Sequence, residues 1–168
     1  MKNIVLCGFM GCGKSTVGKR LAARLHMTFT DMDSYIEEQA GRTISAIFEQ
    51  DGEAAFREAE HRACVALGQE QGLVIATGGG AVLRPDNVEA LRANGTVVFL
   101  NVDVQTVLKR LKNDTSRPLL QRPDKEDAVR TLMQQRLPLY RAAAAVTVDA
   151  DADADAVAAT IEACLSSI

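Results

Sequence analysis

A lysine and a serine follow a glycine-rich stretch close to the start of the chain. Residues 8–16 read Gly-Phe-Met-Gly-Cys-Gly-Lys-Ser-Thr and match the phosphate-loop pattern G-x-x-x-x-G-K-[ST] at every fixed position. Glycines allow successive backbone N–H groups to turn inward around a phosphate. In such loops the lysine, here Lys14, reaches the β- and γ-phosphates, and the hydroxyl, here that of Ser15, binds Mg²⁺. A bare glycine turn is the alternative, but the pattern favours a nucleoside triphosphate site. The residues expected to bind the nucleotide are Gly11, Cys12, Gly13, Lys14, Ser15 and Thr16.

The thiol of Cys12 lies inside this loop. Inward-turned N–H groups, the start of a helix and Lys14 all favour negative charge there. We hypothesise that an alkylating reagent reacts with Cys12 before the other three cysteines of the chain. An inert small residue at this position is the alternative.

Two aspartates, Asp31 and Asp33, follow the second predicted strand, over residues 27–30. We expect this strand to lie beside the first one, at the edge where doubly wound sheets bind ligands. One carboxylate would then serve a metal and the other a reacting hydroxyl. Two acids that merely cap the next helix are the alternative.

A second group of residues could bind an anionic acceptor. Arg57 lies on an otherwise apolar helix, where a charge needs a partner, and a salt bridge to Glu53 or Glu60 is the alternative. Three glycines, Gly78, Gly79 and Gly80, directly follow a predicted strand and could bring backbone N–H groups against a ligand.

Two more arginines are candidates for anion binding. Arg117 lies in a polar, proline-broken loop over residues 113–123, where a mobile arm over the phosphates is plausible. Arg136 lies on the penultimate predicted helix, and an ordinary exposed helix arginine is the alternative.

Strands and helices alternate along the chain, which predicts a mostly parallel sheet covered by helices on both faces. The most apolar strand, over residues 96–102, is expected to be central. The strands are predicted over residues 3–7, 27–30, 73–76, 96–102 and 146–148. Helices are predicted over residues 15–25, 34–40, 43–50, 53–71, 85–93, 103–112, 124–145 and at the C-terminus. The acidic stretch at 149–155 is expected to be the solvated entrance to the last helix.

The composition excludes several classes of partner. The chain has 168 residues and a net charge of −3, which argues against nucleic acid as the main partner. No apolar run approaches the length of a membrane span. The four cysteines form no C-x-x-C pair, which suits a reducing cytoplasm. We therefore expect a cytoplasmic monomer of one domain.

In order, these motifs resemble the shikimate kinase family. The matching segments are G-F-M-G-x-G-K-S-T at 8–16, D-x-D at 31–33, F-R-x-x-E at 56–60, T-G-G-G at 77–80, R-P-L at 117–119 and the helix of Arg136. The resemblance covers essentially the whole chain. It implies a single domain of the nucleoside-monophosphate-kinase type over residues 1–168, with a five-stranded parallel sheet and helices on both faces. It also implies transfer of the γ-phosphate of ATP to the 3-hydroxyl of shikimate.

The resemblance also implies roles for individual residues. Asp31 would support the metal, and Asp33 would contact the shikimate hydroxyls as the candidate base. Arg117 would come from a lid formed by residues 113–123, and Arg110 would pack near adenine. The carboxylate of shikimate would be held by Arg57, Arg136 and the backbone at Gly78, Gly79 and Gly80.

Other readings of the phosphate loop remain open at this point. A gluconate or nucleoside-monophosphate kinase would share the loop and the fold, without the acceptor residues above. An ATPase or nucleotide switch without shikimate activity is the alternative from another class. A GTP-dependent switch would need an N-K-x-D motif for guanine, and no asparagine of the chain is followed by lysine.

Overall fold

The computed structural model describes residues 1–115 and 117–168. Its five strands are β1 (Asn3–Cys7), β2 (Thr28–Asp31), β3 (Leu73–Ala76), β4 (Gly95–Asn101) and β5 (Val146–Asp149). They form one sheet in the order β2-β3-β1-β4-β5, and every neighbouring pair is parallel. The predicted parallel five-stranded sheet is confirmed.

Two details of the predicted sheet are wrong. β3 pairs with both β1 and β2, so β2 does not lie beside β1. The middle strand is β1, whereas β4 lies one position further out, between β1 and β5. β4 is nevertheless flanked by a strand on each side and covered by helices, which explains why its sequence is almost entirely apolar.

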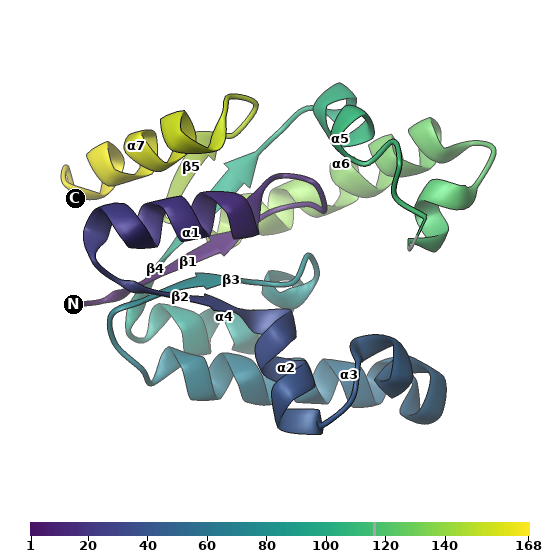
Figure 1. The fold of residues 1–168 in the computed structure, drawn as a ribbon, viewed down its shortest axis with the longest axis horizontal. Coiled ribbons are helices and arrows are strands. Elements are labelled where there is room, and N and C mark those ends of the chain that lie inside the picture. Colours follow the sequence, from purple (N-terminus) through teal and green to yellow (C-terminus); the bar gives the residue numbers. More distant parts are fainter. Residues whose placement is uncertain (116) are drawn as a thin grey trace.

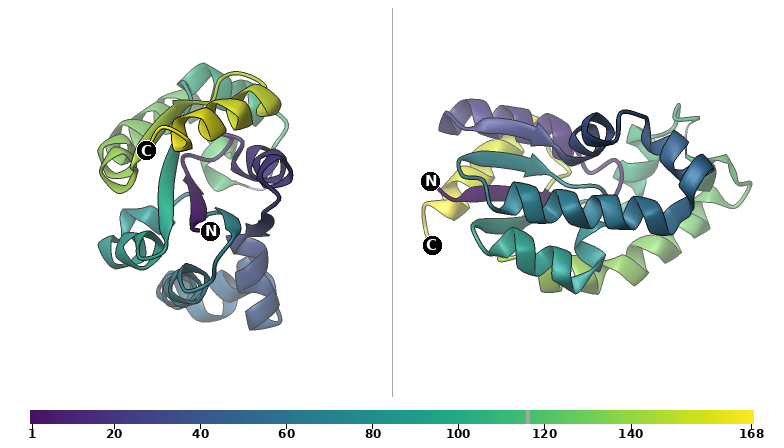
Figure 2. Two further views of the ribbon diagram at one scale, coloured as in Figure 1. Left: turned by 90° about the vertical axis from the view of Figure 1, so that its left-hand side faces the viewer. Right: turned by 90° about the horizontal axis from the view of Figure 1, so that it is seen from below.

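Helices cover both faces of the sheet (Figures 1 and 2). On one face α1 (Lys14–Leu25) packs against α7 (Ala154–Leu165). On the other, α3 (Ile44–Gly68) packs against α4 (Pro85–Arg92), and α6 (Lys125–Ala143) contacts β4. α2 (Met32–Ala40) packs on α3, and α5 (Val104–Arg110) packs on α6.

The helix predictions hold apart from their boundaries. The two helices predicted around residue 52 form the continuous element α3, which is kinked where Gly52 leaves helical geometry at φ 88° and ψ 175°. Two short 3-10 helices were not predicted, η1 (Ala81–Leu83) and η2 (Pro118–Gln121). No helix within the described residues is long and apolar enough to cross a membrane.

The core lies on both sides of β1. Val5, Leu6 and Cys7 are completely buried between the helix layers. Each parallel strand ends at the same edge of the sheet, and the loops after β1, β2 and β3 therefore come together there. This edge holds the site.

Candidate active site

The phosphate loop has the conformation that its sequence predicts. It joins β1 to α1, and Gly8 adopts φ 149°. A Cβ atom at Gly8 would lie 2.8 Å from the carbonyl oxygen of Leu100, so a larger residue does not fit there. The Nζ atom of Lys14 donates hydrogen bonds to the carbonyls of Gly8, at 2.7 Å, and Phe9, at 3.2 Å. The ammonium group thus lies against the loop that would hold phosphate.

Ser15 and Asp31 meet at the start of the adjoining helices. The hydroxyl of Ser15 donates to Oδ2 of Asp31 at 2.9 Å, and Oδ1 of Asp31 accepts from the backbone N–H of Ser34 at 3.0 Å. Asp31 therefore caps α2, which was the alternative interpretation. It also faces Ser15, as the expected metal-binding role requires. A hydroxyl and a carboxylate are the oxygen ligands that suit Mg²⁺. Within the described part of the chain no cluster of three or more His, Cys, Asp or Glu side chains forms a metal site, so water and phosphate would complete the coordination.

Asp33 lies in the first turn of α2 and is half-buried. It faces the glycine segment, since a Cβ atom at Gly78 would lie 3.1 Å from Oδ1 of Asp33. Burial raises the pKa of Asp33, and the nearby charge of Asp31 raises it further, while Lys14 acts in the opposite direction. A carboxylate with a raised pKa is a better proton acceptor than an exposed aspartate.

Arg57 lies across the cavity from the phosphate loop. Its Nη1 atom lies 3.0 Å from Oε1 of Glu60, and its Nε atom lies 3.7 Å from Oε1 of Glu53, so the predicted salt bridges both exist. The guanidinium nevertheless faces the site, because a Cβ atom at Gly80 would lie 2.8 Å from Nη1. A side chain at position 80 would therefore displace the Arg57 guanidinium.

Glu60 was not predicted as a site residue. It is 2% exposed, and burial raises its pKa while the hydrogen bond from Arg57 acts against that rise. A buried carboxylate needs such a partner. Helical spacing predicts the pair of Arg57 and Glu60, but it does not predict that this carboxylate is buried beside the site.

Arg136 reaches the same cavity from α6. Its guanidinium carbon lies 5.7 Å from the centre of the Phe9 ring, and a Cβ atom at Gly79 would lie 3.5 Å from its Nη1 atom. Tyr140, a second residue not predicted for the site, donates a hydrogen bond from its hydroxyl to the carbonyl of Gly79 at 2.7 Å. α6 thus contacts the glycine segment through two side chains.

Arg117 lies at the rim of the cavity, paired with Asp114. The predicted lid loop at 113–123 includes η2, and Ser116 of that loop lies outside the described residues.

These residues line one cavity of about 500 Å³. The predicted residues that the cavity brings together are Gly11, Gly13, Lys14, Ser15, Thr16, Asp31, Asp33, Arg57, Gly78, Gly79, Gly80, Arg117 and Arg136. The two ends of the cavity differ in chemistry. The phosphate loop forms one end, the arginines and the glycine segment form the other, and Asp33 lies between them. The cavity can therefore hold a nucleotide phosphate and an anionic acceptor together.

Arg110 and Cys12 line a second, smaller cavity of about 240 Å³ behind the loop. Arg110 donates to the carbonyls of Gly11, at 3.2 Å, and Ala150, at 3.0 Å, and so connects the phosphate loop to the turn before α7. Within the acidic stretch, Asp153 caps α7 by accepting from the backbone N–H of Ala156.

The structure argues against Cys12 as the first site of alkylation. Cys12 is 1% exposed, because its side chain packs beneath the loop. Cys7 and Cys64 are also buried, and burial raises the pKa of each to about 12. Cys164 is the only half-buried thiol of the four, so it is the one a reagent reaches first.

The fold and the site define a small-molecule kinase with a phosphate loop. A family model described as shikimate kinase matches residues 10–166. The shikimate kinase of Sulfurihydrogenibium sp. (strain YO3AOP1) is 50% identical over 143 residues, covering 85% of this chain and 85% of the relative. The shikimate kinase of Pseudomonas paraeruginosa (strain DSM 24068 / PA7) is 48% identical over 144 residues, covering 86% of this chain and 84% of the relative.

Solved structures agree with these relatives. The structure of shikimate kinase from Acinetobacter baumannii in complex with shikimate has a TM-score of 0.92 and 41% identity, covering 99% of this chain and 94% of that one. A gluconokinase from Sinorhizobium meliloti 1021 has a TM-score of 0.59 and 17% identity, which shows a shared fold alone. The chain belongs to the shikimate kinase family. An ATPase or nucleotide switch without shikimate activity is not favoured.

Proposed function

We propose how the residues of this cavity divide the shikimate kinase reaction, in which the γ-phosphate of ATP passes to the 3-hydroxyl of shikimate. The observation that carries the proposal is the single cavity in which Lys14, Asp33, Arg57 and Arg136 converge. A bond forms between the 3-oxygen and the γ-phosphorus, and the bond to the oxygen bridging the β- and γ-phosphates breaks. ADP leaves, and the hydroxyl proton passes to Asp33.

The phosphate end is formed by the loop at 8–16. Its backbone N–H groups would surround the β-phosphate, and Lys14 would move from the Gly8 carbonyl to the phosphate oxygens. Ser15 and Asp31 would hold Mg²⁺, Ser15 directly and Asp31 through the hydroxyl or a bound water. When bound there, Mg²⁺ supplies neutralisation of the charge on the β- and γ-phosphates.

The acceptor end orients the hydroxyl toward that phosphate. Asp33 lies between the phosphate loop and the glycine segment, and its raised pKa suits a base that must take a proton. Arg57, Arg136 and the backbone N–H groups of Gly78–Gly80 would hold the shikimate carboxylate. Because the carboxylate is held at a fixed place away from the reacting hydroxyl, that hydroxyl is brought within reach of the phosphate.

Further parts of the proposal concern the rim and the cellular setting. Arg117 would stabilise the transferred phosphate when the loop at 113–123 closes as a lid. Arg110 would pack beside adenine, in the cavity that it shares with the turn before α7. We also propose that the protein is a cytoplasmic monomer and that residues 1–168 fold as a single kinase domain.

Replacing either carboxylate-binding arginine by lysine tests the acceptor end. Arg57→Lys and Arg136→Lys keep the charge but lose the planar fork that pairs with two carboxylate oxygens. We expect the Kd for shikimate to rise at least about tenfold in each variant. The Kd for ATP, measured by calorimetry without shikimate, should stay within about twofold, because the proposed partner of both arginines is the shikimate carboxylate and not the nucleotide.

Arg130→Lys is the matched control for this experiment. Arg130 lies on α6 like Arg136, but it is exposed and pairs with Glu126 at 3.5 Å. Its replacement should leave both affinities unchanged. Equal losses of ATP and shikimate affinity in Arg57→Lys or Arg136→Lys would mean that the assigned site is wrong.

A further inference from the structure

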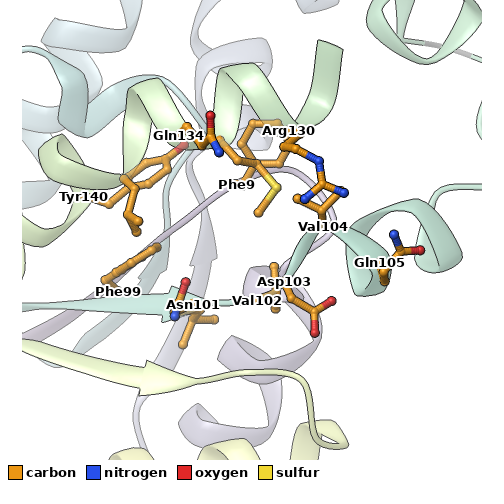
Figure 3. A pocket seen from close by; sticks show the side chains of 13 residues that line it. Phe9, Phe99, Asn101, Val102, Asp103, Val104, Gln105, Arg130, Gln134 and Tyr140 are labelled. Atoms are coloured by element: carbon orange, nitrogen blue, oxygen red, sulfur yellow. The ribbon is translucent and has the colours of Figure 1, made fainter. Parts of the chain in front are cut away.

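Tyr140 is a polar side chain that is buried at the back of the active site. It is 2% exposed, and its ring stacks on that of Phe99 with 5.1 Å between the ring centres. Figure 3 shows the two rings side by side on the wall of a separate pocket of about 440 Å³, which Phe9 also lines. The ring is therefore fixed by apolar packing, and only its hydroxyl reaches toward the substrate cavity.

The hydroxyl of Tyr140 links two parts of the proposed carboxylate site. It donates to the carbonyl of Gly79 at 2.7 Å, and Arg136, one turn earlier on the same helix, places its Nη1 atom 3.5 Å from where a Cβ atom of Gly79 would lie. Burial raises the pKa of Tyr140 to about 12, so the hydroxyl keeps its proton at neutral pH and can donate it to the Gly79 carbonyl.

The position of the Arg136 guanidinium depends on its surroundings. Its side chain has many rotamers, and its guanidinium lies over the face of the Phe9 ring, at 5.7 Å. Pro138, between Arg136 and Tyr140, has no N–H to bond to the preceding turn of α6. The α6 backbone therefore lacks one hydrogen-bond donor between the two residues.

We propose that Tyr140 is a positioning residue for shikimate. Its hydroxyl holds the Gly79 backbone against α6, at a fixed distance from the Arg136 guanidinium on the same helix, so that both meet the same carboxylate. The inference rests on the proposed role of Arg136 and the glycine segment in binding shikimate. Tyr140 itself does not touch the substrate.

Tyr140→Phe removes the hydroxyl and keeps the ring and its stacking on Phe99. We expect the KM for shikimate to rise roughly five- to tenfold, because one buried hydrogen-bond link is lost. The KM for ATP should stay within about twofold and kcat within about threefold, since the reacting groups are unmoved. Tyr35→Phe is the matched control: Tyr35 lies on α2 and lines a different cavity with Ile36 and Arg62. It should leave both KM values unchanged.

A double-mutant cycle with Arg136→Lys separates this inference from the proposed function. If Tyr140 acts by holding Gly79 beside Arg136, the double variant should lose less shikimate affinity than the product of the two single losses. No effect of Arg136→Lys on shikimate would refute the proposed carboxylate site itself. If Arg136→Lys does weaken shikimate binding, three results would overturn the role of Tyr140. These are a wild-type KM in Tyr140→Phe, equal rises in KM for both substrates, or losses that multiply in the double variant.

Discussion

Lys14→Met should reduce shikimate-dependent ATP turnover at least about 10³-fold, because it removes the positive charge that the transferred phosphate meets. The structure places Nζ against the carbonyls of Gly8 and Phe9, inside the loop, where no other lysine lies. Methionine fills a similar volume but cannot stabilise charge. The measurement is kcat/KM in a coupled assay of ADP release, with the thermal midpoint as the check on folding.

Lys19→Met is the control for this variant. Lys19 lies on α1 with Lys14, but it is exposed and lies over the ring of Phe29 at 5.8 Å. Its loss should change turnover by less than about twofold. Activity of Lys14→Met within tenfold of the wild type would show that the loop does not serve phosphoryl transfer in this way.

Asp33→Asn should lower kcat about a hundredfold or more, because asparagine keeps the shape of the side chain but cannot accept the hydroxyl proton. Glu38→Gln, an exposed change on the same helix, should leave kcat unaltered. A rise in KM alone in Asp33→Asn would mean that Asp33 orients shikimate and is not the base.

The raised pKa of Asp33 also predicts how activity and stability depend on pH. As a base Asp33 must be ionised, so kcat/KM, which reports the free enzyme, should fall on acidification at a pH above the ordinary aspartate range. The stability of the folded state changes with pH in the opposite direction. The window lies between the pKa of 3.8 for Asp33 in the unfolded chain and its raised pKa in the folded protein. Within it the native state binds more protons than the unfolded state, so the stability of the fold falls as pH rises. At neutral pH the unliganded Asp33→Asn protein should therefore unfold at an equal or higher temperature, as differential scanning calorimetry would show.

The parts of the site that depend on local sequence were predictable. The phosphate loop combines fixed glycines, a lysine and a serine whose geometry follows from β1 and α1 alone. The cap at Asp31 and the break at Gly52 are equally local, and both occur where the sequence indicates. The acidic residues of 149–155 also give a helix entrance, as expected from the cap at Asp153.

The order of the strands was not predictable in the same way. β1 and β3 are both short and apolar, and nothing in either sequence states which one lies beside β2. The polar residues Thr28 and Thr30 do mark β2 as an edge strand, since its residues are exposed or half-buried. This signal places β2 at the edge but does not identify its neighbour.

Glu60 and Tyr140 were missed because their roles arise from tertiary contact. Tyr140 meets Gly79 from 61 positions away along the chain, which no periodicity reveals. Glu60 could be paired with Arg57 from helical spacing, but its burial follows from the packing of α3 against the glycine segment. The long-range part of a site follows from the fold and not from any one motif.

ADP release with three acceptor conditions tests the central claim most directly. The protein is incubated with ATP and Mg²⁺ together with shikimate, without an acceptor, or with shikimate that lacks the 3-hydroxyl. ADP is measured by coupled assay and the phosphorylated product by ³¹P NMR. The proposed mechanism predicts equal amounts of ADP and a phosphate monoester with shikimate, and almost no ADP in the other two conditions. Rapid ADP release without an acceptor, or phosphorylation of the 3-deoxy compound, would contradict it.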